Sequence, residues 1–337
     1  MKKFLVTGGA GFIGSHIVEE LLKRKCFVRV LDNLSSGKRE NLPRGLARGL
    51  IPKGPVPGFE LIKGDIRDKS ACNKACKGMD FVLHQAALRS VPKSMTDPAS
   101  YNEVNIGGTL NMLEAALKNK VKGFVFASSS SVYGDIDKFP EKENFLPRPI
   151  SPYALTKLTG EYYCKIFSLH HGLPTVALRY FNVFGPRQSL DDEYAVVIPK
   201  FITCMLNNER PPIFGNGKQS RDFTYVDNVV EANILAARGL TPCPAYGGAE
   251  GPVPVTKHEV FNVANGKDHT VLELVELLNK IIGKDIKPKF LPVRPGDVLR
   301  TCADISKIKK TLHFAPKVKF TDGLKLTVEY FSRYDKK

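Results

Sequence analysis

Residues 3–15 read KFLVTGGAGFIGS. The apolar run at 3–7 predicts a short buried strand, and a pattern of helical period follows the glycines. Gly8, Gly11 and Gly14 stand between the two, where they permit a tight turn and the close approach of a pyrophosphate to the backbone. The free N–H groups at the start of the helix would stabilise that anion. The stretch therefore predicts a dinucleotide-binding turn, with Gly-x-x-Gly-x-x-Gly in place of the better-known Gly-x-Gly-x-x-Gly spacing.

Strand and helix patterns alternate over the first half of the chain. Short buried apolar runs bounded by turn residues predict strands, and stretches of helical period lie between most of them. This alternation favours an α/β fold of Rossmann type, with a doubly wound parallel sheet. The later predicted strands are Phe27–Leu31, Phe59–Ile62, Phe81–His84, Phe124–Ser128 and Thr175–Arg179, and the predicted helices are Ser70–Lys77, Tyr101–Lys118 and Tyr153–His171.

The pattern becomes looser in the second half of the chain. Short strands and helices mix there, and stretches rich in Pro and Gly interrupt them, the longest at Gly239–Pro254. We therefore expect a dinucleotide-binding domain over 1–181 and a smaller, mainly substrate-binding lobe over 182–337. The strand near Phe261 and the last helix, Leu324–Tyr334, are expected to pack back on the first domain.

Composition sets limits on the kind of protein. The 337 residues, 42% of them apolar, suffice for a sizeable core and roughly two domains. The net charge of +16 is spread along the chain without a basic block, so we expect no nucleic-acid partner and a field that attracts an anionic, diphosphate-bearing substrate. The odd number of cysteines, seven, fits no disulfide framework, and no metal site is expected. No uncharged apolar run reaches the ~18 residues of a membrane span, so a cytoplasmic protein is expected.

Asp32 ends the second predicted strand, 18 residues after Gly14. A carboxylate there can accept hydrogen bonds from ribose hydroxyls and would repel a 2′-phosphate, which favours NAD over NADP. An ordinary turn aspartate is the alternative. Asp65 follows the next strand, where it would meet the adenine, whereas an N-cap role for Asp68 is the simpler interpretation of that segment.

Tyr153 and Lys157 carry the strongest chemical signal. Residues four apart share one helix face, so the ammonium is expected close to the phenol. A free tyrosine has a pKa of about 10, and a nearby cation favours the phenolate and lowers that pKa. Ser151 suits the N-cap and Pro152 the first helical position, so Tyr153 falls in the first turn, where the helix dipole also favours an anion. The pair is therefore a candidate general base and its supporting cation.

Ser129 lies 24 residues before Tyr153, just past a predicted strand. Ligands of such sheets bind beyond the carboxyl ends of the strands, so this hydroxyl is placed to hydrogen-bond a reacting oxygen. A plain Ser-rich turn over 128–131 is the alternative.

With these motifs in place, the chain resembles the extended short-chain dehydrogenase/reductase family over nearly its whole length. The order and spacing of the pieces are those of the family. The matching pieces are TGGAGFIGS at 7–15, LDNLSSG at 31–37, HQAA at 84–87, SSSSVYG at 128–134, SPYALTK at 151–157, RYFNVFGPRQ at 179–188, RDFTYVDN at 221–228 and RPGD at 294–297.

Within the family the chain is similar to UDP-hexose 4-epimerases, especially to those that accept UDP-N-acetylglucosamine, through LRSVPKSMTDP at 88–98 and EYAVVIPKF at 193–201. The resemblance implies that Tyr153 takes the proton of the sugar 4-hydroxyl while Ser129 helps to hold it. The C4 hydride passes to the nicotinamide, the 4-keto sugar turns over, and the hydride returns to its other face. Lys157 would also hold the nicotinamide ribose, and NAD would stay bound.

The resemblance also implies the wider site and a homodimer formed through the helices near 101–118 and 153–171. The residues implied for NAD are Gly8, Gly11, Phe12, Ile13, Gly14, Asp32, Asn33, Ser35, Ser36, Gly37, Asp65, Ile66, Gln85, Ala86, Ala87, Asn105, Tyr153, Lys157 and Tyr180. Those implied for the UDP-sugar are Arg89, Ser90, Ser129, Ser130, Ser131, Tyr153, Asn182, Ala195, Val196, Arg221, Arg294 and Asp297.

Other reactions of the family are weakened by two residues. The 4,6-dehydratases usually carry Asp-Glu at the positions of Ser130 and Ser131, and the UDP-glucuronate decarboxylases usually carry Glu at the position of Ser131. A UDP-glucose 4-epimerase and a UDP-uronate epimerase remain open. A non-catalytic NAD-binding regulator is the rival of another class, but it would not need Tyr153, Lys157 and Ser129 together.

Arg89 departs from the pattern, because N-acetylhexosamine epimerases usually have a glycine there. Two interpretations remain. The side chain turns to solvent or to the diphosphate, or it binds a carboxylate on the sugar.

Overall fold

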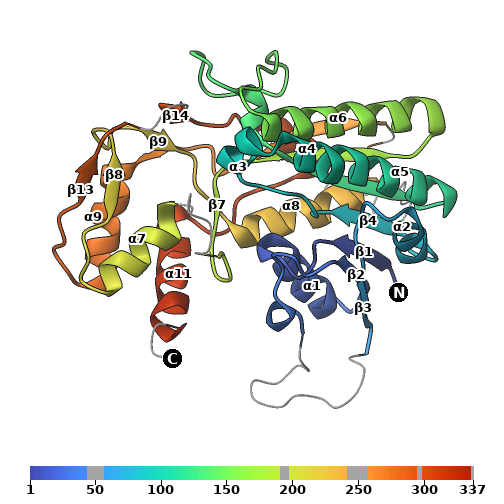
Figure 1. Cartoon of the computed structure of the whole chain (residues 1–337), viewed down its shortest axis with the longest axis horizontal. Coiled ribbons are helices and arrows are strands. Elements are labelled where there is room, and N and C mark those ends of the chain that lie inside the picture. Colours follow the sequence, from blue (N-terminus) through green and yellow to red (C-terminus); the bar gives the residue numbers. More distant parts are fainter. Residues whose placement is uncertain (44–56, 190–196, 241–254, 256, 294–297, 335–337) are drawn as a thin grey trace.

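The computed structural model describes residues 1–43, 57–189, 197–240, 255, 257–293 and 298–334 (Figure 1). Its centre is a sheet of seven strands in the order β11-β6-β5-β4-β1-β2-β3, and every neighbouring pair is parallel. The predicted Rossmann-type α/β fold is confirmed. The strands are β1 Lys3–Thr7, β2 Phe27–Asp32, β3 Phe59–Lys63, β4 Phe81–His84, β5 Gly123–Ser129, β6 Thr175–Tyr180 and β11 Glu259–Val263.

Helices cover both faces of this sheet. On one face lie α1 (Phe12–Lys23) and α8 (Val226–Gly239), and on the other lie α2 (Lys69–Cys76), α5 (Gly108–Lys118) and α6 (Pro152–His171). Successive strand side chains point to opposite faces, and because both faces are covered the strands are apolar throughout. That is why they were recognisable in the sequence as continuous apolar runs.

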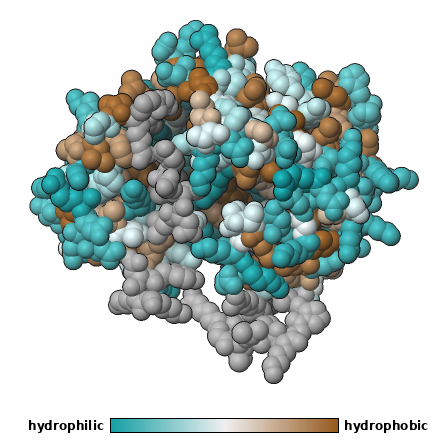
Figure 2. All heavy atoms as spheres, viewed as in Figure 1, coloured by the Kyte–Doolittle hydropathy of each residue, from teal (hydrophilic) through white to brown (hydrophobic). Residues whose placement is uncertain are grey.

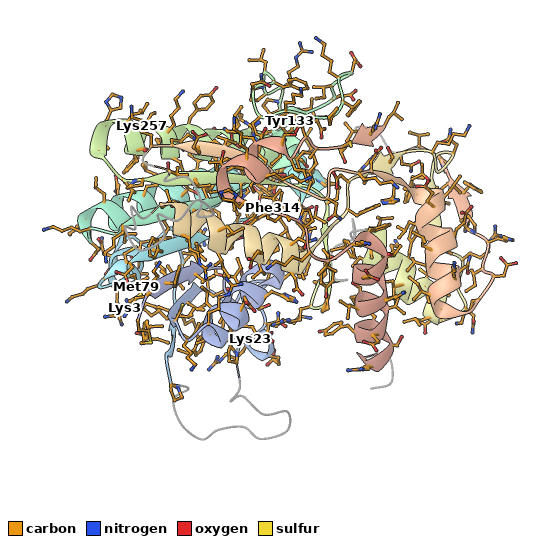
Figure 3. All side chains as sticks on the ribbon, turned by 180° about the vertical axis from the view of Figure 1, so that it is seen from behind. Lys3, Lys23, Met79, Tyr133, Lys257 and Phe314 are labelled. Carbon is orange, nitrogen blue, oxygen red and sulfur yellow. The ribbon has the colours of Figure 1, made fainter. Side chains whose placement is uncertain are left out.

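Burial sorts the side chains as this layering requires. Tyr133 and Phe314 lie inside the molecule, whereas Lys23 and Lys257 lie at its outside (Figure 3). The face seen in Figure 2 is largely hydrophilic, with hydrophobic residues scattered among the polar ones. Among the residues that the structure describes, no helix is both long and apolar enough to cross a membrane.

The helix predicted over 101–118 is helical throughout, but it is not α-helical along its whole length. It consists of α4 (Pro98–Tyr101), a π-helical stretch (Asn102–Gly107) and α5. The Asn105 side chain in the π-helical stretch accepts a hydrogen bond from the Leu88 backbone N–H at 2.8 Å. Single π-helical turns inside helices are common at functional sites. Here the wider turn accompanies a bond that ties the helix to the segment after β4.

A second lobe has a core of its own, built on α7 (Val197–Leu206), α9 (Val271–Ile282) and α11 (Phe320–Tyr334). The prediction that the last helix packs on the first domain is wrong, since α11 packs on α7 and α9. An amphipathic sequence shows that a helix buries one face but not against which partner. The strand around Phe261 is β11, which pairs with β6 at the edge of the main sheet.

Short elements complete the two lobes. Within the second lobe β9 lies between β12 and β14, β8 pairs with β13, and β7 pairs with β10. Their bounds, with those of the remaining helices, are α3 Val91–Thr96, β7 Val183–Phe184, β8 Pro212–Phe214, β9 Ser220–Arg221, β10 Thr224–Tyr225, β12 His269–Thr270, β13 Lys289–Leu291, β14 Arg300–Thr301, α10 Ser306–Leu312, and the 3₁₀ turns Arg39–Asn41 and Ser130–Tyr133.

Candidate active site

The predicted site residues gather at one edge of the sheet. Gly8 follows β1, Asp32 ends β2, Gln85 follows β4, Ser129 ends β5 and Tyr180 ends β6. These strands are parallel neighbours, so their carboxyl ends meet at the same edge (Figure 1). Sheets of this kind bind ligands in the crevice outside that edge.

The glycine-rich turn is too tight for side chains. Gly8 has a φ of +65°, and a Cβ on it would lie 2.8 Å from the Ala86 backbone nitrogen. A Cβ on Gly14 would overlap the Gly8 carbonyl oxygen. Gly11 precedes α1 and contributes no side-chain cap, so the first N–H groups of α1 remain for another acceptor. The cradle fits a pyrophosphate.

Phe12 and Ile13 begin α1 and are half-buried. Their side chains pack against the core of the second lobe. The start of the helix therefore faces the junction of the two lobes. A contact of these residues with NAD remains a prediction.

Asp32 is buried and stabilises the glycine-rich turn through hydrogen bonds. Its carboxylate accepts hydrogen bonds from the backbone N–H groups of Ala10, at 2.9 Å, and Leu34, at 2.8 Å. Gly37 packs tightly against the same turn, because a Cβ on Gly37 would lie 2.8 Å from the Ala10 Cβ. The neighbouring polar residues that were predicted for NAD, all exposed, are Asn33, Ser35 and Ser36.

Asp65 is bound by its neighbours. It accepts hydrogen bonds from Asn33 Nδ2 and from the Arg67 guanidinium, both at 2.9 Å. The hydrogen bond with Arg67 holds the pKa of the Asp65 carboxyl well below its usual range. Ile66 beside it is buried beneath α5, and Asp68 caps α2, as its alternative interpretation predicted. The adenine contact of Asp65 remains a prediction.

His84 is a buried link that was not predicted as a site residue, although it stands in the HQAA motif. Its ring nitrogens lie 2.7 Å from Thr7 Oγ1 and 3.0 Å from Thr109 Oγ1. Burial lowers the pKa of this imidazole to about 3, so the ring is neutral. Thr7 Oγ1 in turn accepts a hydrogen bond from the Ala86 backbone N–H at 3.2 Å. His84 thus helps to fix the segment that carries Ala86 and Ala87.

Tyr180 and Gln85 meet across the sheet edge. The Tyr180 hydroxyl lies 3.1 Å from Gln85 Oε1 and accepts a hydrogen bond from Asn233 Nδ2 at 2.8 Å. Burial raises the pKa of Tyr180. Asn233 lies on α8, far along the chain, and no local sequence signal pointed to it.

Asn105 joins the segment after β4 to α6. Its amide donates to the Leu88 carbonyl at 3.0 Å and to Thr156 Oγ1 at 3.1 Å. The Tyr101 hydroxyl donates to the Ser90 carbonyl at 2.7 Å. These bonds fix the main chain on both sides of Arg89. The direct NAD contact predicted for Asn105 remains a prediction.

The start of α6 is built as the sequence predicts. Ser151 Oγ accepts a hydrogen bond from the Ala154 backbone N–H at 3.2 Å, and Pro152 is the first helical residue. Tyr153 is therefore in the first turn. Lys157 follows one turn later, buried, with its Nζ 6.0 Å from the centre of the Tyr153 ring. That Nζ donates to the Ala127 carbonyl at 2.7 Å, which fixes α6 against β5.

Burial decides the protonation of this pair. Burial raises the pKa of the Tyr153 phenol, while a hydrogen bond with Ser129 and the positive charge of Arg89 oppose that rise. Burial lowers the pKa of the Lys157 ammonium to about 8. The expectation of a lowered tyrosine pKa is therefore wrong for this structure, because desolvation outweighs the neighbouring positive charge.

Ser129 links the end of β5 to Tyr153. Its hydroxyl hydrogen-bonds the phenol and accepts from Ser131 Oγ at 2.8 Å and from the Ser131 backbone N–H at 3.2 Å. Ser129 thus also caps the 3₁₀ turn that begins with Ser130. The Ser-rich turn that was the alternative interpretation is thus present, and the hydroxyls of Ser129 and Ser131 are joined within it.

The second lobe supplies Asn182 and Arg221. Asn182 Nδ2 donates to Thr301 Oγ1 at 2.9 Å, which joins the end of β6 to β14. Arg221 is half-buried on β9, and its guanidinium donates to the Ser220 carbonyl at 2.8 Å. The predicted substrate residues Ala195, Val196, Arg294 and Asp297 lie outside the described residues.

Two buried carboxyl groups near Arg221 were not predicted. Asp222 accepts from the backbone N–H of Gly266 at 2.9 Å, and Glu141 accepts from that of Cys302 at 3.1 Å. Burial raises the pKa of Asp222 to about 7 and that of Glu141 to about 8. Within the described part of the chain, no group of three or more His, Cys, Asp or Glu side chains could hold a metal ion.

Comparison with known proteins agrees with this geometry. The model of the NAD dependent epimerase/dehydratase family matches residues 4–243. The solved UDP-N-acetylglucosamine 4-epimerase of Methanobrevibacter ruminantium M1, in complex with UDP-N-acetylmuramic acid, is 43% identical, with a TM-score of 0.87 over 99% of both chains. The solved UDP-glucose 4-epimerase of Thermotoga maritima, with UDP-glucose, is 40% identical, with a TM-score of 0.86 over 98% of this chain and 99% of that one.

A third solved structure carries the cofactor. The UDP-glucuronic acid 4-epimerase of Bacillus cereus, in complex with UDP-glucuronic acid and NAD, is 34% identical, with a TM-score of 0.83 over 98% of this chain and 99% of that one. The chain belongs to the NAD-dependent epimerase/dehydratase family of extended short-chain dehydrogenases/reductases. The predictions of the family, of an enzyme and of NAD as its cofactor are confirmed.

Proposed function

We propose that this enzyme interconverts the C4 epimers of a UDP-hexose, most of all UDP-N-acetylglucosamine and UDP-N-acetylgalactosamine. The observation that carries the proposal is the meeting of Tyr153, Lys157 and Ser129 at the edge of the sheet that also carries the glycine-rich turn. A phenol, a hydroxyl bonded to it and a buried ammonium are the groups needed to move a proton at a secondary alcohol.

The chain's own residues divide the work. Bound NAD supplies a hydride acceptor and donor for C4. Tyr153 takes the proton of the 4-hydroxyl and later returns it, and Ser129 orients the reacting oxygen through its bond to the phenol. Lys157, with a pKa of about 8, is largely charged at pH 7, so its ammonium favours the phenolate during the transfer. The chain gains no net electrons over the cycle.

Small side chains support epimerisation over elimination. A 4-keto sugar that turns over needs room on both sides. The side chains of Ser90, Ser130 and Ser131 are small and would leave that room. Dehydration needs an additional acid and base, and the turn after β5 carries hydroxyls at Ser130 and Ser131. These residues favour an isomerase over a dehydratase or a decarboxylase.

A second candidate is an epimerase of a carboxylate-bearing UDP-sugar. Arg89 is exposed, and its charge acts on the Tyr153 phenol, so a cation stands near the reacting group. Two of the similar structures hold acidic UDP-sugars, UDP-N-acetylmuramic acid and UDP-glucuronic acid. A guanidinium binds a carboxylate through paired hydrogen bonds. UDP-glucose is the simplest further alternative substrate.

We also propose that the lobe over 182–337 binds the UDP part, through Asn182 and Arg221 among the described residues. Asn182 lies at the junction with the first domain, over 1–181, two residues after the end of β6. Arg221 on β9 lies near enough to Glu141 of that domain to act on the pKa of its carboxyl group. A guanidinium suits a diphosphate, since its donors bind oxygens in pairs. Loss of UDP affinity in Arg221→Ala, with NAD retained, would support this division of the chain.

A homodimer through α6 is part of the proposal. One face of this helix exposes large apolar side chains, with relative exposures of 53% for Leu155, 55% for Tyr162, 46% for Ile166 and 54% for Leu169. Their spacing of seven, four and three residues keeps them on one side of the helix. Exposed apolar stripes of this kind mark interaction surfaces. A monomer in light scattering at micromolar concentration would refute this part.

The substrate is tested with a panel of UDP-sugars. The holoenzyme is incubated with UDP-N-acetylglucosamine, UDP-glucose, UDP-N-acetylmuramic acid and UDP-glucuronic acid, and the C4 epimers are separated. We expect the N-acetylhexosamine pair to be interconverted fastest. A preference for either acidic sugar would favour the second candidate, and turnover of none would refute the proposal.

A further inference from the structure

Glu161 lies one helical turn beyond Lys157 on α6 and has no part in the proposed reaction. It is buried, and both of its oxygens are occupied. Oε1 accepts from Ser128 Oγ at 2.5 Å and from Arg179 Nε at 2.9 Å, and Oε2 accepts from Arg179 Nη2 at 2.7 Å. One carboxylate therefore joins α6 to two strands of the sheet.

The two partners of Glu161 are partners of each other in the sheet. Ser128 on β5 stands opposite Arg179 on β6, and the next opposed pair is Ser129 and Tyr180. Side chains of one register pair point to the same face, and those of the next pair point to the other. Glu161 thus fixes the pair Ser128 and Arg179, which directly precedes the strand ends at Ser129 and Tyr180.

The same helix holds β5 at a second point. Lys157 Nζ donates to the Ala127 carbonyl, directly before Ser128. Lys157 and Glu161, four residues apart, therefore bind consecutive residues of β5. Both contacts precede Ser129, whose hydroxyl bonds Tyr153 at the start of the same helix. The phenol and the hydroxyl reach each other because α6 and β5 are held in this one position.

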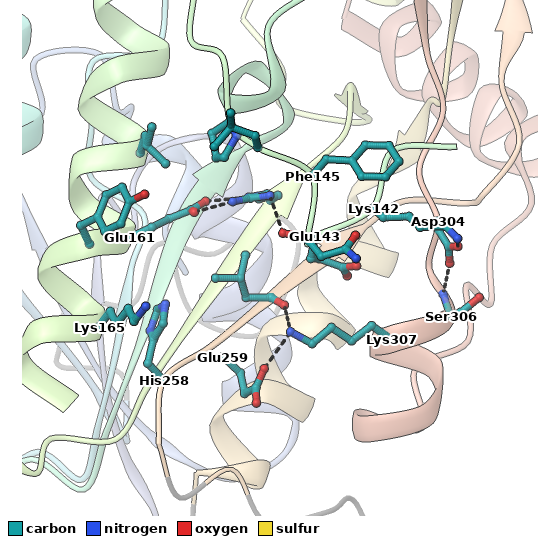
Figure 4. A pocket seen from close by; sticks show the side chains of 17 residues that line it. Lys142, Glu143, Phe145, Glu161, Lys165, His258, Glu259, Asp304, Ser306 and Lys307 are labelled. Carbon is teal, nitrogen blue, oxygen red and sulfur yellow. Dashed lines mark hydrogen bonds and ion pairs between the residues drawn. The ribbon is translucent and has the colours of Figure 1, made fainter. Parts of the chain in front are cut away.

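Arg179 extends the link away from the helix. Its guanidinium carbon lies 4.7 Å from the centre of the Tyr133 ring, and the Tyr133 hydroxyl donates to Asn262 Oδ1 at 2.7 Å. The ion pair lines a groove of about 790 Å³ between α6, residues 142–147 and β11 (Figure 4). Both side chains of the pair remain almost fully buried, at 4% and 5% exposed.

Burial of such a pair needs a reason other than stability. Desolvation of two charges offsets most of their attraction, and apolar pairs of similar volume often stabilise a fold equally well. What an apolar pair cannot supply is the directed bond to Ser128 together with a two-point bond to Arg179. The directed geometry is therefore the property that distinguishes Glu161 from a packing residue.

We propose that Glu161 is a positioning residue, whose carboxylate holds the ends of β5 and β6 against α6 so that Ser129 and Tyr153 stay within reach of one reacting oxygen. This inference rests on the proposed function. It assigns no contact with substrate or cofactor to Glu161. The residue acts through Ser128 and Arg179.

The test compares Glu161→Gln and Ser128→Ala with the wild-type holoenzyme. We expect kcat for the best UDP-sugar to fall at least ~30-fold in Glu161→Gln and about 10-fold in Ser128→Ala, while KM and NAD content stay within about threefold. The kcat of the double variant should be little lower than that of Glu161→Gln alone, since both changes break the same link between α6 and β5. A folded Glu161→Gln with wild-type kcat, or losses that multiply in the double variant, would overturn the proposal.

A matched control removes a comparable carboxylate elsewhere. Glu231 on α8 binds Arg24 Nη2 at 2.6 Å on the other face of the sheet. Glu231→Gln should lower the melting temperature without the selective loss of kcat. If Glu161→Gln does not fold, Ser128→Ala decides, because it leaves the ion pair in place, and wild-type kcat in that variant overturns the proposal.

Hydrogen–deuterium exchange of the holoenzyme provides a measurement that needs no turnover. The peptide that contains 129–134 should exchange faster in both variants than in the wild type and in Glu231→Gln. Unchanged exchange in that peptide would overturn the positioning role. A wild-type protein that turns over no UDP-sugar would instead refute the proposed function, and exchange would still test the role of Glu161.

Discussion

The Lys157 Nζ lies 6.0 Å from the centre of the Tyr153 ring. Burial moves the pKa values of the two groups in opposite directions, up for the phenol and down to about 8 for the ammonium. Neither shift favours a phenolate at pH 7. The phenol holds its proton more tightly than a free tyrosine, with its pKa of about 10, and the ammonium loses its proton more readily than a free lysine, with its pKa of about 10.4. The phenol of the free site therefore carries its proton, and the hydrogen bond with Ser129 and the positive charge of Arg89 make its loss less unfavourable.

Tyr153→Phe should nearly abolish epimerisation while NAD stays bound. The change removes one hydroxyl and leaves the ring and the Lys157 contact with Ala127 in place. General-base effects are worth about 10²–10⁴ in rate, so we expect a loss of that order in kcat. The rate is measured by separation of the C4 epimers, and NAD is quantified after denaturation. Turnover close to that of the wild type would remove Tyr153 from the reaction.

Asp32→Ala should narrow the preference for NAD over NADP. The acid would repel a 2′-phosphate, and its removal relieves that repulsion. The change also frees the backbone N–H groups of Ala10 and Leu34, so the affinity for NAD should fall as well. Asp32→Asn is the matched control, because it keeps an acceptor oxygen without the charge. Equal affinity of the wild-type protein for both cofactors, measured by titration, would contradict the role.

Arg89→Gly should separate acidic from neutral substrates. If Arg89 binds a carboxylate, kcat/KM for UDP-N-acetylmuramic acid or UDP-glucuronic acid should fall while that for UDP-N-acetylglucosamine holds or rises. A charge-assisted hydrogen bond is worth about 1.5–3 kcal/mol, roughly one to two powers of ten in selectivity. Arg89→Lys keeps the charge, so its selectivity for acidic over neutral sugars should lie between those of the wild type and Arg89→Gly. Parallel changes for both kinds of sugar would leave Arg89 without a carboxylate role.

Stability should fall as the pH rises from about 7 to 8, above the range in which buried neutral histidines such as His84 have the opposite effect. Burial raises the pKa of Glu141 to about 8 and that of Asp222 to about 7, so the folded protein holds these protons more tightly than the unfolded chain does. Their contribution to stability is complete below about pH 4 and is lost as the pH rises through about 7 and 8. Urea unfolding at several pH values measures it. Glu141→Gln should flatten the slope, and a stability that rises between about pH 7 and 8 would contradict the prediction.

The sheet was predictable because parallel strands covered on both faces are apolar throughout. Each predicted strand agrees with an observed one to within a residue or two, and the cap of α6 by Ser151 was a local signal as well. Both features depend on neighbours in the chain. Local sequence therefore determined the frame of the site and the helix that carries Tyr153.

The features that sequence reasoning missed depend on distant partners. The sequence of the π-helical stretch predicts an ordinary α-helix. The structure departs from an α-helix where the Asn105 side chain bonds the Leu88 backbone. His84 and Glu161 bind side chains from other elements, which no local pattern reveals. The rise in the Tyr153 pKa follows from burial, and the spacing to Lys157 could predict only the opposing effect of a cation.

The most direct test of the account follows the hydrogen at C4. The holoenzyme is incubated with UDP-N-acetylglucosamine deuterated at C4, and the product is analysed by mass spectrometry and NMR. If one bound NAD takes the hydride and returns it to the other face, the C4 epimer should retain the deuterium fully, and Tyr153→Phe should form almost none of that product. Exchange of the C4 deuterium with solvent hydrogen, or release of a stable 4-keto sugar as the main product, would contradict the account.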